Sequence, residues 1–251
     1  MFYQTHQVQG SLRSIEHHYG HGIAEPMHQH QAIQLLHVIQ GVIRVYTPDG
    51  CWVVPPTQGI WIPEGIAHSL LAVGAVSIDT VFIAPHLGRD RAHKLGTFQV
   101  NALLSALIHT ATTFEATVQE DSREARVNAL ILDEVARLNF RDFNVPMPKE
   151  PVLKQACLHI SEHVARPWAL ADMALMLSVS ERTVSRKFYA HMGMSFGEWL
   201  RQLRLAKSME LMASGYSVTD AALAVGYESH SSFSMMFKQR VGIAPSLFVA
   251  H

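Results

Sequence analysis

The chain of 251 residues has little charge, only two cysteines and no long apolar run. Charged residues make up 16% and the net charge is −1, which excludes a generally polycationic nucleic-acid binder but not a local basic face. Cys51 and Cys157 form no metal motif and no disulfide framework, as expected in a reducing compartment. No stretch approaches the roughly 18 apolar residues of a membrane span, and residues 1–20 lack a signal-peptide core. We therefore expect a soluble, cytoplasmic protein without a membrane partner.

Histidine and charge are spread unevenly and divide the chain into two unlike halves. Residues 1–149 hold 11 of the 16 histidines and 10 Lys+Arg against 13 Asp+Glu, whereas residues 150–251 hold 10 Lys+Arg against 8 Asp+Glu. Between the halves, Pro146, Pro148 and Pro151 stand in a polar stretch that is typical of a semi-rigid linker. Hydrophobic residues, at 48%, supply enough apolar surface for folded domains on both sides.

The first half begins with short predicted strands. Within residues 23–85, runs rich in β-branched and aromatic residues alternate with Gly and Pro turns, which favours a sandwich or barrel. The expected strands are Ile33–Ile39, Val42–Tyr46, Trp52–Val54, Ile60–Ile62, Ser69–Val73 and Val76–Ala84.

Two helices are expected to follow, at 98–114 and 122–138, because the apolar residues change to a helical period there. The second helix has an apolar face, formed by Val127, Leu130, Ile131, Val135 and Leu138. That face needs a partner, which is the first helix, the barrel or a second copy of the chain.

The strongest pattern is a duplication in the second half. Asp172-Met173-Ala174 recurs 48 residues later as Asp220-Ala221-Ala222. A short turn follows each copy and leads to Ser180 or Ser229, whose hydroxyl can accept hydrogen bonds from the first N–H groups of a helix. Gly226 suits a left-handed turn residue in the second copy. This pattern is typical of two helix-turn-helix units.

A single helix is expected between the copies, because Ser195 and Glu198 form a capping box that opens a helix running to about Met212. With this spacer, the second half closely resembles the AraC/XylS class of bacterial transcription regulators. The residues that carry the resemblance are Arg204-Leu205-Ala206-Lys207, Ala221 to Gly226, Tyr227, Ser232-Phe233, Phe237-Lys238 and Gly242-Ile243-Ala244-Pro245. The resemblance implies two recognition helices in successive major grooves, about 34 Å apart on one face of DNA.

The resemblance places the first recognition helix at Glu181 to Tyr189. We expect its exposed face to carry Arg182, Ser185 and Arg186, which recur at helical spacings of three and four. Arg182 and Arg186 then hydrogen-bond guanine edges bidentately. Lys187 is expected to contact phosphate.

The second recognition helix is placed at Ser229 to Arg240. The residues expected to face outward are His230, Ser231, Ser234 and Met235. Met235 departs from the family pattern, because it stands where an Arg or polar residue is common and can only touch a thymine methyl group. We therefore expect the second unit to read fewer bases, with Lys238 and Arg240 contacting phosphates.

Two histidine motifs stand in the first half. His28-x-His30 precedes the first strong predicted strand, and alternate residues of a strand point the same way, so the two imidazoles can share one ion. With Gln34 in the usual Glu position, this segment resembles the first cupin motif, and Pro63-x-Gly65-x-x-His68 resembles the second. The resemblance implies a cupin-like sensor barrel in which His28, His30, Gln34 and His68 converge.

Two interpretations of this cluster stay open. Neutral imidazoles suit Zn, Fe, Ni or Cu, but an amide is a weaker ligand than a carboxylate and leaves the charge of a divalent ion uncompensated. Alternatively, the same side chains hydrogen-bond an organic effector or one another. Trp61 is expected to line the pocket, and Trp52 and Tyr46 are further candidates; for each of the three, packing in the core is the alternative. A second metal site is conceivable in an irregular segment with His6, His17, His18 and His21.

The expected fold class is α+β and multidomain, with an N-terminal cupin-like β-barrel plus a helical pair and a C-terminal all-α double helix-turn-helix domain. The expected regions are a sensor barrel at 1–96, a helical dimerisation region at 97–139, a linker at 140–151 and a DNA-binding domain at 152–251. The expected function is a transcription regulator rather than an enzyme. It binds a double-stranded DNA operator as a homodimer, is controlled by a small molecule or metal in the barrel, and contacts RNA polymerase if it is an activator.

Two alternatives belong to other classes. One is a metal-dependent cupin enzyme, a dioxygenase or isomerase with a DNA-binding tail, against which Gln34 stands in place of the expected carboxylate. The other is a metalloregulator in which the ion is itself the signal. The effector, the target genes and the direction of regulation leave no residue pattern in the sequence.

Overall fold

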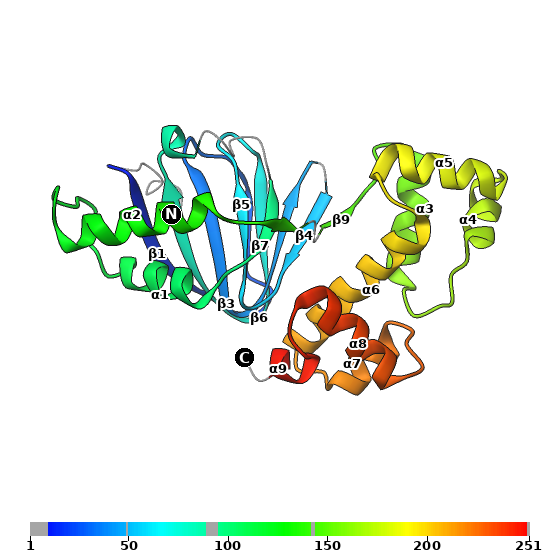
Figure 1. Ribbon diagram of the computed structural model, residues 1–251. Helices are drawn as coiled ribbons and strands as arrows, with labels where there is room; N and C mark the ends of the chain where they lie inside the picture. Colours follow the sequence, from blue (N-terminus) through cyan, green and yellow to red (C-terminus); the bar gives the residue numbers. More distant parts are fainter. Residues whose placement is uncertain (1–9, 49, 89–94, 142–143, 250–251) are drawn as a thin grey trace. The chain divides into compact units, whose positions relative to one another are not determined.

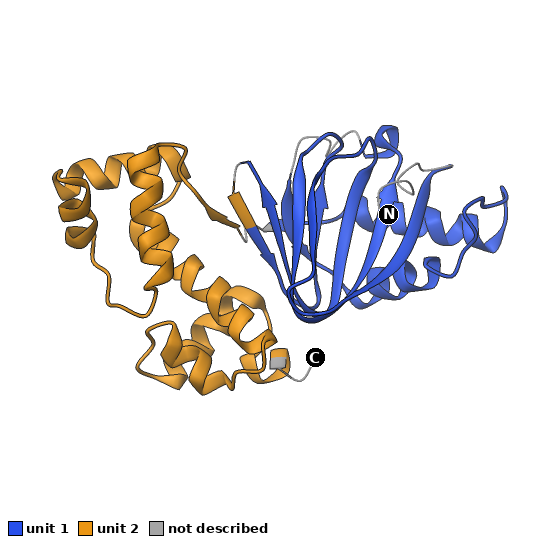
Figure 2. Ribbon diagram, turned by 180° about the vertical axis from the view of Figure 1, so that it is seen from behind, with its two compact units in different colours: residues 1–48, 52–143 blue, residues 49–51, 144–251 orange. Residues whose placement is uncertain are grey.

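The computed structural model describes residues 10–48, 50–88, 95–141 and 144–249 (Figure 1). The chain divides into two compact units, one of residues 1–48 and 52–143 and one of residues 49–51 and 144–251 (Figure 2). His6, one of the predicted metal ligands, lies outside the described residues.

An antiparallel sheet forms the N-terminal unit. Its strands in the described residues are β1 (Leu12–Tyr19), β2 (Ala24–His28), β3 (Ile33–Thr47), β4 (Gly50–Val54), β5 (Gln58–Ile62), β6 (His68–Ile83), β7 (Gly96–Gln99) and β8 (Phe140–Arg141). The main path of the sheet is β1-β6-β3-β5-β7-β8, with β2 paired to β6 and β4 paired to β3. The long strands β3 and β6 therefore organise the sheet, since each pairs with different neighbours along its two halves.

Strands β3 and β6 are each continuous where the sequence predicted two strands. The predicted pieces were Ile33–Ile39, Val42–Tyr46, Ser69–Val73 and Val76–Ala84. The β3–β6 register shifts on either side of Gln40, and Gly41 has φ +74°. A Cβ at Gly41 would lie 2.4 Å from the Ala75 carbonyl oxygen, so glycine is required there. The predicted turn residues thus bend a strand instead of ending it.

The two faces of the sheet are both apolar. Because side chains alternate along a strand, Leu35 of β3 and Val81 of β6 belong to one core, while Leu36 and Ile78 belong to the other. The first core lies under two helices, α1 (Ala102–Ala111) and α2 (Arg123–Ala136), which Asn101 and Ser122 cap through their side chains. A 3-10 turn, η1 (Pro85–Leu87), follows β6.

The apolar face predicted on α2 finds its partner within this unit. Ile131 and Val135 are buried in the core with α1 and the sheet, and Val127 and Leu138 pack against it. Leu130 is the exception, with 48% of its surface exposed.

Other predictions for the first half need correction. Residues 12–19, expected to be irregular, form β1, whose polar residues pair with β6. Residues 98–101, expected to be helical, begin in β7, which pairs with β5, and the helix starts after Asn101. The expected linker at 140–151 contains β8 and β9 (Asn144–Pro146), and Pro151 opens the next helix.

The C-terminal unit is helical apart from short strand segments (Figure 1). Its helices are α3 (Pro151–Glu162), α4 (Leu170–Leu177), α5 (Glu181–Met192), α6 (Phe196–Ala213), α7 (Val218–Ala224), α8 (His230–Val241) and α9 (Pro245–Val249). Helix α6 is the predicted spacer, and Ser195 caps its start. No helix in the described part of the chain is both long and apolar enough to cross a membrane.

Aromatic side chains form the core of this unit. Phe188 of α5 and Trp199 of α6 are fully buried, with ring centroids 5.8 Å apart. The Trp199 Nε1–H donates to the Pro146 carbonyl oxygen at 2.9 Å, which ties α6 to β9. Phe233 and Phe237 of α8 are likewise fully buried.

Candidate nucleic-acid interface and histidine cluster

The first helix-turn-helix unit consists of α4, a tight turn and α5. Ser178 takes the left-handed conformation at the end of α4, with φ +53°. Ser180 is the predicted N-cap of α5, and its Oγ accepts a hydrogen bond from the Thr183 N–H at 3.3 Å. The helix starts at Glu181, as predicted, and ends at Met192, one turn later than predicted.

One face of α5 is exposed and polar. Val184 and Phe188 are fully buried, whereas Arg182, Ser185 and Arg186 are exposed. Among the residues that the structure describes, none forms a hydrogen bond or ion pair with either guanidinium group. The face that the sequence assigned to base contact is therefore available to an external partner.

Lys187 has a partner within the chain that was not predicted from the sequence. Its ammonium group donates to the carboxylate of Glu150, at the N-cap position of α3, and His191 lies 3.4 Å from the same carboxylate. The hydrogen bond from Lys187 lowers the pKa of Glu150. Lys187 is only one-third exposed, so a phosphate contact requires competition with Glu150.

The second unit consists of α7, a turn and α8. Gly226 takes the predicted left-handed conformation, with φ +85°. The Oγ of Ser229 accepts a hydrogen bond from the Ser232 N–H and caps α8. Both predicted features of the second copy are thus present in the structure.

The face of α8 is less polar than that of α5. Its exposed predicted residues are His230, Ser231, Met235 and Lys238. Met235 is 72% exposed, which leaves its thioether side chain accessible. Ser234, expected to face outward, is half-buried, and its Oγ is buried without a partner among the described residues. Arg240 forms an ion pair with Glu198 of α6, so a phosphate contact by Arg240 would compete with this intramolecular pair.

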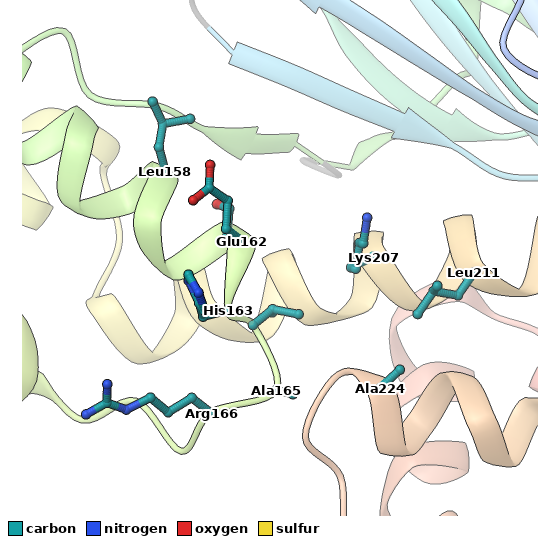
Figure 3. Close-up of a pocket in the computed structure, with 10 residues that line it drawn as sticks. Leu158, Glu162, His163, Ala165, Arg166, Lys207, Leu211 and Ala224 are labelled. Atoms are coloured by element: carbon teal, nitrogen blue, oxygen red, sulfur yellow. The ribbon is translucent and has the colours of Figure 1, made fainter.

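A pocket of about 600 Å³ opens in this unit where the α3–α4 loop approaches α6 and α7 (Figure 3). Its labelled lining residues are Leu158, Glu162, His163, Ala165, Arg166, Lys207, Leu211 and Ala224. His159, Glu162 and His163 form an exposed cluster on α3 whose ligand atoms lie within 4.8 Å of one another. Neither feature was predicted from the sequence.

In the N-terminal unit, the predicted histidines do come together. His28 of β2 is the register partner of His68 of β6, and their rings are 4.3 Å apart. The rings of His30 and His68 are 5.1 Å apart, and one ligand atom from each of the three histidines falls within a 4.8 Å group. Gln34 joins them, since its Oε1 lies 3.0 Å from the His30 Nε2.

The hydrogen bonds of the three rings favour one tautomer. Each Nδ1 lies within hydrogen-bond distance of a backbone carbonyl, of Pro26 for His28 (2.9 Å), Ala32 for His30 (2.7 Å) and Ile66 for His68 (2.8 Å). A neutral imidazole that donates from Nδ1 has an unprotonated Nε2, which is the form that binds a metal ion. Burial lowers the pKa of His30 and so favours its neutral form.

The side-chain amide of Gln34 adds a further oxygen atom beside the three imidazoles. With Nδ1 protonated, the His30 Nε2 and the Gln34 Oε1 are both hydrogen-bond acceptors at 3.0 Å. Two acceptors at this distance need a cation between them, or an amide turned so that its NH₂ group donates. The donor set therefore fits a divalent transition ion held by His28, His30 and His68 with Gln34 beside them.

The aromatic residues predicted to line this site divide between the two cores. Trp61 is fully buried in the core under α1 and α2, which is the opposite face of the sheet from Gln34, so its predicted place in the pocket needs correction. Trp52 belongs to the core on the other face. Tyr46 is half-buried, with the Arg44 guanidinium 5.6 Å from its ring centre.

A second polar cluster of this unit was missed by the sequence analysis. Glu16 of β1, Asp79 of β6 and His109 of α1 bring ligand atoms within 4.8 Å of one another. His17, His18 and His21 do not gather into a cluster of this kind in the described chain. The available sequence signal was a charged residue, Asp79, inside the predicted strand Val76–Ala84.

The comparisons with known proteins match the C-terminal unit to a protein family. A family described as "Helix-turn-helix domain" matches residues 173–251. The transcriptional regulator NimR of Escherichia coli is 26% identical over 91% of this chain and 83% of its own length. RipA of Corynebacterium glutamicum, another regulator, is 32% identical over 51% of this chain and 39% of its own length.

Among solved structures, ToxT from Vibrio cholerae is similar with a TM-score of 0.40 and 13% identity, covering 95% of this chain and 98% of that one. The family match covers α5 and α8, the two helices whose polar faces are exposed. The likeness to NimR extends through the N-terminal unit as well. With its two capped helix-turn-helix units, this chain carries a DNA-binding helix-turn-helix domain in its C-terminal unit and is similar to bacterial HTH-type transcription regulators.

Proposed function

We propose that α5 and α8 read an operator and that the histidine cluster of the N-terminal unit binds the effector that controls this reading. The proposal that α5 reads the operator is supported by the exposed face of this helix, where Arg182 and Arg186 lie opposite the buried Val184 and Phe188. A guanidinium group with no partner in the described chain can donate bidentately to the O6 and N7 atoms of guanine.

The two recognition helices contribute unequally under this proposal. Helix α5 supplies two arginines and Ser185 for base edges. Helix α8 supplies His230, Ser231 and the exposed Met235, which offers apolar contact to a thymine methyl group. Lys187 and Lys238 contact phosphates, Lys187 by exchanging Glu150 for the DNA backbone.

Arg186→Ala tests the base-reading role. We expect specific operator affinity to fall by about 1–3 kcal/mol, with relaxed preference at one base position, because one bidentate contact is lost. The operator is first selected from random DNA with the unaltered protein, and affinities are then measured by fluorescence anisotropy. Lys187→Ala should weaken all sequences alike and reduce the salt dependence by about one charge.

Arg137→Ala is the matched control, since Arg137 is also an exposed arginine but lies after α2 in the N-terminal unit. Its operator binding should equal that of the unaltered protein. Unchanged affinity and unchanged base preference in Arg186→Ala would contradict the placement of α5 in the groove.

For the effector site, the three Nδ1–H donors support a divalent transition ion on His28, His30 and His68. The ion would supply a positive charge that the neutral imidazoles and Gln34 leave uncompensated, which favours an anionic organic ligand as the signal. Binding of the effector changes the equilibrium between states with different operator affinity.

The metal content of protein purified without an affinity tag tests this site. We expect near-stoichiometric transition metal, lost in His28→Ala and retained in a variant of an exposed histidine outside the cluster, His86→Ala. Operator binding before and after chelation then shows whether the ion is the signal. If neither protein holds metal and added Zn²⁺ does not bind, the cluster is an organic effector site with direct hydrogen bonds to the ligand.

We also infer that the regulator acts as a homodimer. The apolar face of α2 is already used within its own unit, so the large apolar side chains that α1 and α2 leave exposed for a partner copy are Leu103 and Leu130, at 53% and 48% exposure. Sedimentation at micromolar concentration, with Leu130→Glu as the disrupting variant, tests this; a monomeric mass for the unaltered chain would rule it out.

A further inference from the structure

A row of polar side chains crosses three strands on the helix-covered face of the sheet. In the β1–β6 register Glu16 is opposite Asp79, and in the β3–β6 register His37 is opposite Asp79. On the same face, Leu35 and Val81 belong to the apolar core under α1. The polar row therefore borders an apolar core, where a charged group costs free energy of folding unless another group compensates its charge.

Helix α1 contacts this polar row through His109. His109 follows the buried Ile108 on α1, and its Nδ1 lies 3.2 Å from the Asp79 Oδ2. The Asp79 side chain is 0% exposed, while that of His109 is 62% exposed. The cluster is thus anchored by a buried carboxylate and reaches solvent through His109 and Glu16.

The contacts in the structure do not satisfy this cluster. The Asp79 Oδ1 and the His37 Nδ1 are both buried and have no hydrogen-bond partner among the described residues. His37 is only 3% exposed. These two unpartnered atoms belong to residues that are opposite each other in the β3–β6 register, which indicates that something outside the protein chain completes the site.

The donor set and spacing suit a cation. Two donors each about 2.1 Å from one tetrahedral ion are about 3.4 Å apart. The His109 Nδ1 and the Asp79 Oδ2, which hydrogen-bond to each other at 3.2 Å, therefore need to move apart by only a few tenths of an ångström to share an ion. Glu16 supplies a second carboxylate within 4.8 Å, on an exposed side chain whose Oε1 also lies 3.3 Å from the His18 Nε2. Two carboxylates also balance the charge of a divalent ion, which the cluster of His28, His30 and His68 does not.

We propose that Glu16, Asp79 and His109 form a second, separate binding site for a divalent transition ion of the Zn²⁺ or Mn²⁺ class, with His37 beside it. Mixed carboxylate and imidazole donors suit these ions and disfavour soft ions such as Cu⁺. The bound ion joins β1, β6 and α1, so it stabilises the packing of α1 on the sheet. The site is independent of operator reading and of the effector site proposed above.

The test uses the full chain carrying His28→Ala and His159→Ala, which removes the other two histidine clusters. After treatment with a chelator, this background is titrated with Zn²⁺ and with Mn²⁺ by calorimetry. We expect one equivalent of either ion to bind. His109→Gln and Glu16→Gln should each weaken binding by at least about tenfold, since even outer-shell partners have effects of this size.

Both of these variants change exposed side chains and keep a polar group at the position, and Asp79→Asn serves as the buried counterpart. His86→Gln, an exposed histidine elsewhere, should leave binding unchanged. A second readout is hydrogen exchange, in which the ion should slow exchange in β1 and α1. Absence of binding in the background, binding that His109→Gln and Glu16→Gln leave intact, or unchanged exchange in β1 and α1 would each overturn the proposal.

Discussion

Replacing Gly226 with alanine is the sharpest test of how the second helix-turn-helix unit is built. Gly226 has φ +85°, and a Cβ there would lie 2.5 Å from the Ala165 carbonyl oxygen and 3.1 Å from the Arg204 Nη2. The same arginine donates to the carbonyl oxygens of Val164 and Arg166 at 3.3 and 2.9 Å. The turn is thus pressed against a loop that Arg204 already holds in place.

The expected loss of stability has two parts. A non-glycine residue in the left-handed region costs about 1–2 kcal/mol, and displacing a packed backbone carbonyl costs a further 1–3 kcal/mol or so. Gly226→Ala should therefore destabilise the C-terminal unit by about 2–5 kcal/mol, a large part of the 5–15 kcal/mol typical of a domain. Gly215→Ala is the matched control, because Gly215 has φ +96° but no atom within 4 Å of an added Cβ.

The assay is urea unfolding followed by helical circular dichroism, which reports mainly on the helix-rich C-terminal unit. Gly215→Ala should lose only the conformational part, about 1–2 kcal/mol. Gly226→Ala should lose more and should also weaken operator binding, since α8 follows directly. Equal destabilisation of the two variants would refute the reasoning, because the close approach to Ala165 would then have no energetic effect.

Three further outcomes follow from the contacts of single side chains. Hydrogen bonds from Arg201 and Arg240 lower the pKa of Glu198, so this carboxylate stabilises the folded state above its unfolded pKa, and the stabilisation is lost as the pH falls through its folded pKa. Glu198→Gln should therefore make the free energy of unfolding less dependent on pH in that acidic range, as measured by urea unfolding at a series of pH values. Burial raises the pKa of Cys157 to about 12, so maleimide at neutral pH should label Cys51 first, as seen by mass spectrometry. Trp199→Phe leaves a buried β9 carbonyl without its donor and should cost about 1 kcal/mol in urea unfolding.

Local sequence signals predicted the C-terminal unit well. The serine caps Ser180, Ser195 and Ser229 each accept a backbone hydrogen bond at the start of the expected helix. A cap acts within one turn, so its evidence lies in four consecutive residues. The capping box at Ser195 is only half present, because the Glu198 carboxylate pairs with arginines instead.

The first half was harder because its strands depend on distant partners. Residues 12–19 have few apolar side chains and were expected to be irregular, yet they pair along their whole length with β6. The histidine cluster could be predicted because His28-x-His30 resembles a known motif, although β2 ends at His28 and His30 lies just beyond the strand. The opposite placement of Trp61 could not, since it depends on which face of β5 meets α1 and α2.

The cluster at Asp79 shows what remained hidden and why. Glu16, His37 and Asp79 come from three strands, and His109 comes from a helix 30 residues beyond Asp79. Only the register places them in one row, and no spacing along the chain encodes a register between strands that are far apart in sequence. What the sequence does show is an aspartate in the middle of a mostly apolar strand. A charge at such a position costs free energy unless a partner compensates it, so it directs attention to whatever the fold brings opposite it. Here the fold brings His109, the Glu16 carboxylate and His37, and the described chain leaves the Asp79 Oδ1 and the His37 Nδ1 without a hydrogen-bond partner.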